Sequence, residues 1–425
     1  MGLNAPQRKN IAIAIAAYAI AIVVWIVHAY PRLLTASGGQ DFRGRLPHPR
    51  AHGAIVGPIH IASLANVTFE YRLDGARTGA SHESLGELAA APSWTYRPLN
   101  VGIHDASKAS PAVDDSGIYI GADSSWFYAL DLAGKLRWKL RIAEASRGIH
   151  GTAALDGDFA YVGGYNGSLY ALRKRDGELA WTLRLGDTIG SSPAIVGDSL
   201  YVSVETFSPP DGFVARVRRA TGEVVWLSEW LGDQSHSSPT IDEHDGLVLA
   251  GANSSFYRAF RIDTGEEAWR VPTRGPVKDT GCLVDGIVYF TSFAGALYAV
   301  NASDGKVVWE TPLPGKSRSS PTLADGVLVV GVDDGSILGV TAATGKIAWR
   351  VETGFPNMIG SALAVGPIAW MACSSHEVCA LRAATGEVVQ RLDAGDSVTG
   401  VPTAFRGSLY VATDLLGGLL RFDQR

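Results

Sequence analysis

The sequence is poor in cysteine, with only Cys282, Cys373 and Cys379 among 425 residues. None of them lies in a Cys-x-x-Cys-His motif, and no group of cysteines and histidines has the spacing of a zinc site. Charged residues make up 19% of the chain, and the formal net charge is -5. The sequence contains no basic stripe with interleaved aromatic residues. These absences argue against a c-type haem protein, a zinc-dependent fold and a nucleic-acid-binding protein.

Long hydrophobic runs are also scarce, and the one that stands out covers residues 11–27 and extends to residue 30. A helix that crosses a bilayer needs about 20 apolar residues. A cleavable signal peptide is the alternative, because Arg8 and Lys9 form a charged start and Val27-His28-Ala29 resembles a small-x-small cleavage site. Since the run exceeds the roughly 7 to 15 residues of a signal-peptide core, we favour a retained anchor.

Glycine and tryptophan, in contrast, are abundant, with 49 and 11 copies. The tryptophans recur at intervals of 40 to 45 residues, which is typical of propeller blades, and from the second position onward a glycine lies four residues earlier. The aromatic position is occupied in turn by Trp94, Trp138, Trp181, Trp226, Trp269, Trp309, Trp349 and, in the eighth place, Gln390.

A second marker, a patch of small residues and proline, occurs earlier in each unit. It is clearest at Ser191-Ser192-Pro193, Ser237-Ser238-Pro239 and Ser319-Ser320-Pro321. Alternating apolar runs with hairpin turns such as Tyr165-Asn166-Gly167 follow it. We therefore predict an all-β, eight-bladed β-propeller of four-stranded antiparallel blades, with small residues at the inner rim and tryptophans between blades.

The ends of the repeat region predict how the ring closes. The last unit ends with residues 419–423 in the place of a third strand, whereas residues 93–96 have no preceding strands of their own. We expect the N-terminal strand at 93–96 to complete the last blade.

The unit Ala-x-Asp-x-x-x-Gly-x-x-x-Trp, seen from Ala129 to Trp138, resembles the tryptophan-docking repeat of the pyrroloquinoline-quinone-like propellers. Residues 69–79 are similar to the Phe-Arg-Gly-Asp-x-x-x-Thr-Gly segment that often precedes the first blade in that family. The resemblance covers roughly residues 67–425 and is strongest to the propeller subunit of the outer-membrane β-barrel assembly machine. That subunit is a lipoprotein, whereas no cysteine follows the apolar segment here to carry a lipid.

The resemblance implies either a quinone-dependent enzyme or a binding scaffold. A calcium and quinone centre requires several oxygen ligands and a carboxylate base, yet the inner strands offer mainly Ser, Thr, Pro, Ala and Gly, with Glu205 and Asp279 as isolated candidates. We therefore predict a non-enzymatic scaffold without cofactor or metal, which binds other membrane or periplasmic proteins in a larger envelope complex. A quinoprotein-type dehydrogenase, or a small-ligand sensor that uses the central channel, is the alternative.

These inferences divide the chain into a cytoplasmic tail (1–10), a transmembrane signal anchor (11–30), a proline- and glycine-containing linker (31–66) and the propeller (67–425). A simple count of flanking basic residues under the positive-inside rule would place the propeller in the cytoplasm. Long domains translocate largely regardless of such charges, and the resemblance implies the periplasm. We expect a single-pass inner-membrane protein whose propeller faces the periplasm.

The candidate partner-binding residues fall into two groups. Loops that lead into the inner strands should surround one mouth of the channel, and they contain Lys108, His150, His236, Lys278 and Arg318. These residues form either a site for a small anion or a peptide, or an ordinary solvated rim. Outside the repeat positions, Phe207 in an insertion and Trp230 are expected to be exposed, and aromatic residues are favoured at interfaces. We predict no catalytic, cofactor-binding or metal-binding residue.

Cys373 and Cys379 flank a five-residue turn. They form either a disulfide across a hairpin, which would favour an oxidising compartment, or two small buried side chains. The sequence leaves this choice open.

Overall fold

The computed structural model describes residues 53–97, 99, 109–142, 148–356, 360–414 and 418–425. The predicted tail, the anchor, most of the linker and Lys108 lie outside these residues. In the part of the chain that is described, no helix is long and apolar enough to cross a membrane.

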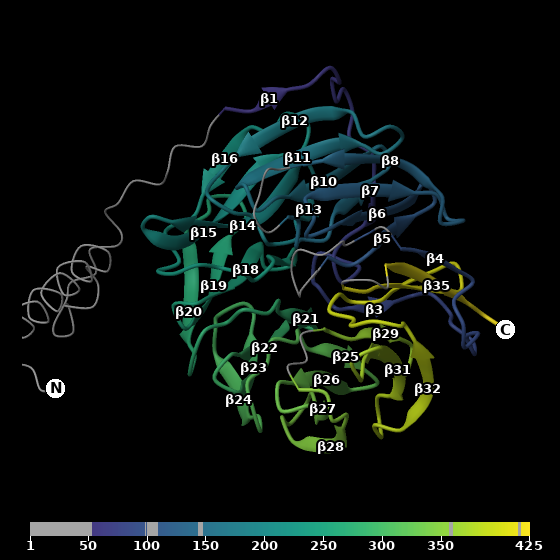
Figure 1. The fold of residues 1–425 in the computed structure, drawn as a ribbon. Helices are drawn as coiled ribbons and strands as arrows, with labels where there is room; N and C mark the ends of the chain where they lie inside the picture. Colours follow the sequence, from purple (N-terminus) through teal and green to yellow (C-terminus); the bar gives the residue numbers. More distant parts are fainter. Residues whose placement is uncertain (1–52, 98, 100–108, 143–147, 357–359, 415–417) are drawn as a thin grey trace, which may run out of the picture. The chain divides into compact units, whose positions relative to one another are not determined.

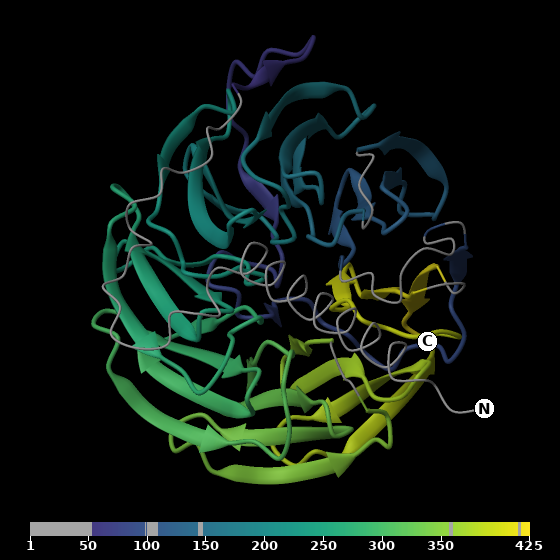
Figure 2. The same ribbon diagram turned by 60° about the vertical axis from the view of Figure 1, so that its left-hand side comes forward.

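The described residues form eight antiparallel four-stranded blades that follow one another around a ring, as predicted (Figure 1, Figure 2). Blades 1 to 4 consist of β5 (Ala112–Asp114), β6 (Gly117–Gly121), β7 (Trp126–Leu130) and β8 (Leu136–Arg141); β9 (Ala154–Asp156), β10 (Phe159–Gly163), β11 (Ser168–Arg173) and β12 (Leu179–Arg184); β13 (Ala194–Val196), β14 (Ser199–Phe207), β15 (Pro210–Arg218) and β16 (Val224–Leu227); and β17 (Thr240–Asp242), β18 (Leu247–Ala252), β19 (Phe256–Arg261) and β20 (Glu267–Pro272).

Blades 5 to 8 repeat the plan. They consist of β21 (Cys282–Val284), β22 (Ile287–Ser292), β23 (Ala296–Asn301) and β24 (Val307–Pro312); β25 (Thr322–Ala324), β26 (Val327–Val332), β27 (Ser336–Thr341) and β28 (Ile347–Glu352); β29 (Leu363–Val365), β30 (Ile368–Ala372), β31 (Glu377–Arg382) and β32 (Val388–Asp393); and β33 (Thr403–Phe405), β34 (Ser408–Ala412), β35 (Leu419–Asp423) and β4 (Trp94–Tyr96). Eight buried apolar clusters form the core, one at each interface between neighbouring blades.

The repeat tryptophans join the blades at the outer strands. The indole N–H of Trp181 in blade 2 donates to the carbonyl of Arg219 in blade 3 at 2.9 Å, and its ring lies against Gly222. Gly222 has a φ of +72°, and a Cβ there would come within 2.8 Å of the ring, so only glycine satisfies both the turn and the packing. The same pair of contacts recurs at Trp94, Trp138, Trp226, Trp269, Trp309 and Trp349.

The small residues of the inner rim also join the blades. Just before seven of the eight inner strands, a backbone N–H donates to the hydroxyl at the equivalent position of a neighbouring blade, over 2.8 to 3.1 Å. We call this set the hydroxyl ring: Ser110, Thr152, Ser192, Ser238, Thr280, Ser320 and Ser361, with Val401 in the eighth place.

The ring closes as predicted, because β4 pairs antiparallel with β35 (Figure 1). No hairpin connects these two strands, so blade 8 lacks the outer turn on which a tryptophan of blade 7 would dock. Gln390 stands in that place, and its side-chain amide bonds both the N–H and the carbonyl of Leu88, at 3.2 and 2.6 Å. The exception to the tryptophan repeat therefore falls where the chain makes its one discontinuous blade.

The segment before the first blade lies inside the ring. Residues 67–81, which we call the strap, begin with β2 (Val67–Phe69) on the inner edge of blade 2 and end with β3 (Ala80–Ser81) on the inner edge of blade 7. Between them, the carbonyls of Gly75, Ala76 and Gly79 accept hydrogen bonds from the inner strands of blades 4, 5 and 7. The strap thus pairs with inner edges that would otherwise be open.

A further short strand, β1 (Ile55–Val56), pairs with β12 on the outer edge of blade 2. The end of the predicted linker is therefore attached to the propeller.

Candidate functional site

The inner strands begin around a cavity of about 70 Å³, which we call the central cavity. It brings together four of the predicted residues from four different blades, namely His150, His236, Lys278 and Arg318. The strap contributes Tyr71 to its lining. Each of the four residues precedes the inner strand of its blade, which is why distant parts of the sequence meet there.

Both histidines of the cavity are paired with a carboxylate of the preceding blade. His150 Nε2 lies 3.0 Å from Asp123 Oδ1, and His236 Nδ1 lies 2.9 Å from Glu205 Oε1. His150 also packs on the ring of Tyr165, with 4.2 Å between the ring centroids. Since its side chain is 13% exposed, His150 is held in place and is not a freely solvated loop residue.

Cationic side chains gather where blades 5 and 6 meet. The charged groups of Lys278, Lys316 and Arg318 lie 4.9, 5.0 and 5.9 Å from the centre of the Phe293 ring. Arg318 also forms an ion pair with Asp333 at 3.3 Å. This side of the cavity is therefore positively charged.

Asp279 is the buried acid of the cavity and is 4% exposed. Its Oδ2 accepts hydrogen bonds from the N–H and the hydroxyl of Thr291, at 2.8 and 2.9 Å, whereas Oδ1 has no hydrogen-bond partner among the described residues. Burial raises the pKa of Asp279 to about 7, although the Thr291 hydrogen bonds favour the charged form. Near pH 7 the Asp279 carboxyl is therefore neutral in a large fraction of the molecules.

The residues of the channel do not fit a calcium and quinone centre. Glu205 is engaged by His236, and the structure places no group of three or more His, Cys, Asp or Glu side chains, within the described ranges, where they would hold a metal ion. The strap crosses the channel, and the cavity of about 70 Å³ is small beside the roughly 300 to 1,000 Å³ of cofactor pockets. We therefore derive no chemistry through such a group.

Phe207 and Trp230 have opposite surroundings. Phe207 is 55% exposed at the tip of the hairpin formed by β14 and β15, next to exposed Pro209 and Pro210. Trp230 is only 8% exposed and packs edge-on against Phe213, with 5.7 Å between the ring centroids. The expectation that Trp230 is exposed was wrong, because the chain after β16 folds back over the blade.

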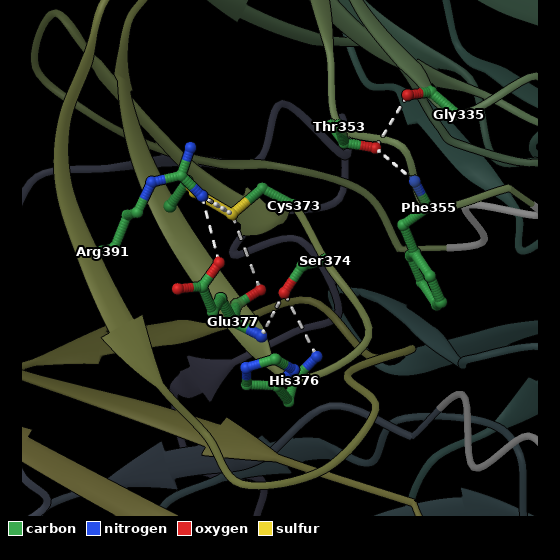
Figure 3. Close-up of a disulfide and its surroundings, with 9 residues drawn as sticks. Gly335, Thr353, Phe355, Cys373, Ser374, His376, Glu377 and Arg391 are labelled. Carbon is green, nitrogen blue, oxygen red and sulfur yellow. Dashed lines mark hydrogen bonds and ion pairs between the residues drawn. A yellow bond between two sulfur atoms is a disulfide. The ribbon is translucent and has the colours of Figure 1, made fainter.

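Cys373 and Cys379 form a disulfide, which decides between the two alternatives (Figure 3). It connects the end of β30 to β31 across a hairpin, with 5.7 Å between the Cα atoms. Arg391 lies beside it and pairs with Glu377 at 3.0 Å. Cys282 is buried in β21 and has a free thiol.

Comparison with known proteins places the fold in a family. A family model described as "Outer membrane protein assembly factor BamB" matches residues 123–280 and 254–413. A protein of that name from Xanthomonas campestris pv. campestris is 31% identical over 171 residues, 40% of this chain and 41% of the relative. One from Yersinia pestis is 27% identical over 274 residues, 58% of this chain and 67% of the relative.

Solved structures share the architecture. BamB from Moraxella catarrhalis has a TM-score of 0.65 at 19% identity, over 80% of this chain and 98% of that chain. A europium-containing methanol dehydrogenase has a TM-score of 0.70 at 15% identity, over 82% and 90%. These two likenesses concern the fold, whereas the family model covers most of the blades in sequence. The chain belongs to the family of the outer membrane protein assembly factor BamB.

Proposed function

We propose that this protein is a non-enzymatic scaffold that binds other proteins of a complex that assembles outer membrane proteins. The observation that carries the proposal is the family match, which extends over residues 123–413. The poor fit of the central channel to a calcium and quinone centre supports a binding function over a dehydrogenase.

The hairpin tip at Phe207 is the proposed docking element. β14 and β15 have nine residues each, more than any other described strand, so their tip extends beyond the other hairpins. Hydrogen bonds from the Phe207 N–H to Asp187 and from the Thr206 hydroxyl to the Pro209 carbonyl hold the tip in shape. An exposed aromatic side chain on an ordered loop loses little entropy on binding, which suits an interface anchor.

We propose that the propeller acts at the periplasmic face of the inner membrane, with residues 11–30 as a single-pass anchor. The disulfide between Cys373 and Cys379 supports this proposal, because such bonds persist in oxidising compartments. A linker from residue 31 would hold the propeller away from the bilayer.

The test is affinity purification of the full-length chain from its own membranes in mild detergent, followed by mass spectrometry. We expect stoichiometric components of an outer-membrane assembly complex, and we expect Phe207→Asp to lose them because a charge replaces the anchor. Val308→Asp is the matched control, since Val308 is 54% exposed on β24 in blade 5. Purification of the wild-type chain alone, or loss of partners with both variants, would contradict the proposal.

A further inference from the structure

We propose that the central cavity is a binding site for a small free oxyanion, that is, a molecule or ion that presents a phosphate or carboxylate group. The argument rests on hydrogen-bond donors that converge on the cavity, on its cationic side chains and on its size. It goes beyond the proposed scaffold function and does not depend on it.

The first observation concerns five buried hydroxyl groups that line the cavity. They belong to the hydroxyl ring, and each accepts a backbone N–H from a neighbouring blade: Ser192, Ser238, Thr280, Ser320 and Ser361. A hydroxyl has one proton to donate in addition to its lone pairs. Within the described part of the chain, none of these five hydroxyls donates to a protein acceptor, so their protons are available to a ligand in the cavity.

The second observation is the charge of the lining. Lys278 and Arg318 provide fixed positive charges from adjacent blades, and Lys278 forms no ion pair with the described residues. His150 and His236 also line the cavity, and they are paired with Asp123 and Glu205, respectively. Lys278 is therefore a lining cation that no carboxylate of the described residues neutralises.

Among the described residues that line the cavity, Asp279 is the one acid. Its Oδ1 is buried and without a hydrogen-bond partner among the described residues, and Arg72 of the strap is the nearby cation that favours its charged form. A neutral Asp279 would instead donate an O–H to a bound oxyanion, as a protonated carboxyl can. The Asp279 carboxyl, whose Oδ1 has no hydrogen-bond partner among the described residues, would thus gain one in the complex.

The volume of the cavity limits the size of the ligand. Its volume of about 70 Å³ suits a group of a few heavy atoms and is below that of cofactor pockets, which take roughly 300 Å³ or more. Inorganic phosphate and acetate are therefore suitable probes, and they separate the two oxyanion types.

The experiment is isothermal titration of the detergent-solubilised full-length chain with each probe. We expect saturable 1:1 binding of at least one probe. Lys278→Gln should weaken it by about tenfold or more, since a charge-assisted hydrogen bond contributes roughly 1.5 to 3 kcal/mol. Lys316→Gln is the matched control, because Lys316 also lies over Phe293 but does not line the cavity.

Two results would overturn the proposal. One is the absence of saturable heat with both probes at concentrations up to tens of millimolar, for a protein whose thermal unfolding is cooperative. The other is an equal loss of affinity in Lys278→Gln and Lys316→Gln, which would indicate a general effect of surface charge. Ser320→Ala gives an independent check, because it removes one ring hydroxyl without changing the charge, and it should also weaken binding.

Discussion

Single residues carry the contacts between blades in this propeller. Each repeat tryptophan donates its indole N–H to a carbonyl of the next blade and packs its ring on a glycine there. In the Gly-x-x-x-Trp pattern, the glycine and the tryptophan therefore belong to two different contacts. The glycine that precedes a tryptophan in sequence receives the tryptophan of the preceding blade. This is why the pattern is regular in sequence although its partners are about 40 residues apart.

Substitution of the docking glycine should cost more than its backbone conformation alone explains. Gly222→Ala introduces a Cβ within 2.8 Å of the Trp181 ring, whereas Gly326 has a similar φ of +75° and nothing within 4 Å. We expect Gly326→Ala to cost about 1 to 2 kcal/mol from the left-handed backbone, and Gly222→Ala about 1 to 3 kcal/mol more from overpacking. Urea unfolding of both variants measures the difference, and equal costs would show that the ring contact is unimportant.

The buried Asp279 should make stability depend on pH. Its pKa is raised from 3.8 to about 7 by burial, so between these values the folded state holds a proton that the unfolded chain has released. The free energy of unfolding therefore falls as pH rises from about 4 to 7 through this group. We expect Asp279→Asn to be more stable than wild type at pH 8, with a gap that narrows toward pH 4.

Thermal unfolding across this pH range tests the expectation. Asp304→Asn is the control, because Asp304 is a surface residue whose only ion pair, in the described ranges, is with Lys306, and such pairs contribute little. A gap between Asp279→Asn and wild type that is the same at pH 4 and pH 8 would be inconsistent with a titrating Asp279.

Among the elements, the strap combines little regular structure with backbone hydrogen bonds to blades 2, 4, 5 and 7. Arg77 is fully buried within it and donates to the carbonyls of Ser192, Pro193 and Pro239, in blades 3 and 4. Arg72 reaches blade 6 through the carbonyl of Pro321 and the hydroxyl of Thr322. Two arginines of the strap thus provide donors for carbonyls at the inner ends of the blades.

Loss of Arg77 should therefore release the strap. We expect Arg77→Ala to destabilise the propeller by about 3 to 5 kcal/mol, because several buried carbonyls and Glu70 lose their counterpart. Arg175→Ala is the control, since Arg175 is 72% exposed and should change stability by less than about 0.5 kcal/mol. Hydrogen exchange of residues 70–79 should rise in Arg77→Ala, and unchanged protection there would contradict the assigned role.

At the scale of the whole molecule, the ring is stabilised by contacts that join its two ends. β4 contributes Trp94 to the interface with blade 1 and pairs with β35, while Gln390 and Leu88 connect blade 7 to the same N-terminal segment. The hydroxyl ring runs across this junction as well, since the Val401 N–H donates to Ser110. Closure is therefore distributed over the outer, middle and inner parts of the ring.

Removal of residues 419–425 should open the ring, because it deletes β35 and leaves β34 and β4 without their common partner. We expect a lower urea midpoint and a transition that is no longer two-state, as in repeat arrays that lose nearest-neighbour contacts. Removal of Arg425 alone is the control, since it breaks an exposed ion pair and one backbone hydrogen bond, both to Glu87, and leaves β35 in place. A single transition with an unchanged midpoint in the longer deletion would show that the pairing of β35 with β4 is dispensable.

The number of blades, their strand order and the closing strand were all predictable, because seven of the eight blades are built from consecutive residues and their hairpins depend on local turns. The hydroxyl ring was signalled by the recurrence of Ser and Thr at one position, but their role was not evident, since most of them bond a residue about 40 positions away and Ser110 bonds Val401. Burial of Trp230 was missed because it depends on how the chain folds back after β16.

The sequence by itself determined the architecture of this protein, since a repeated local pattern can bury its faces only against copies of itself. The tertiary structure alone decided where the strap lies, which side chains surround the central cavity and that Cys373 bonds Cys379. These features depend on which distant surfaces meet. Hydrogen bonding and charge inside the channel arise only where side chains from several blades come together, so no single repeat contains them.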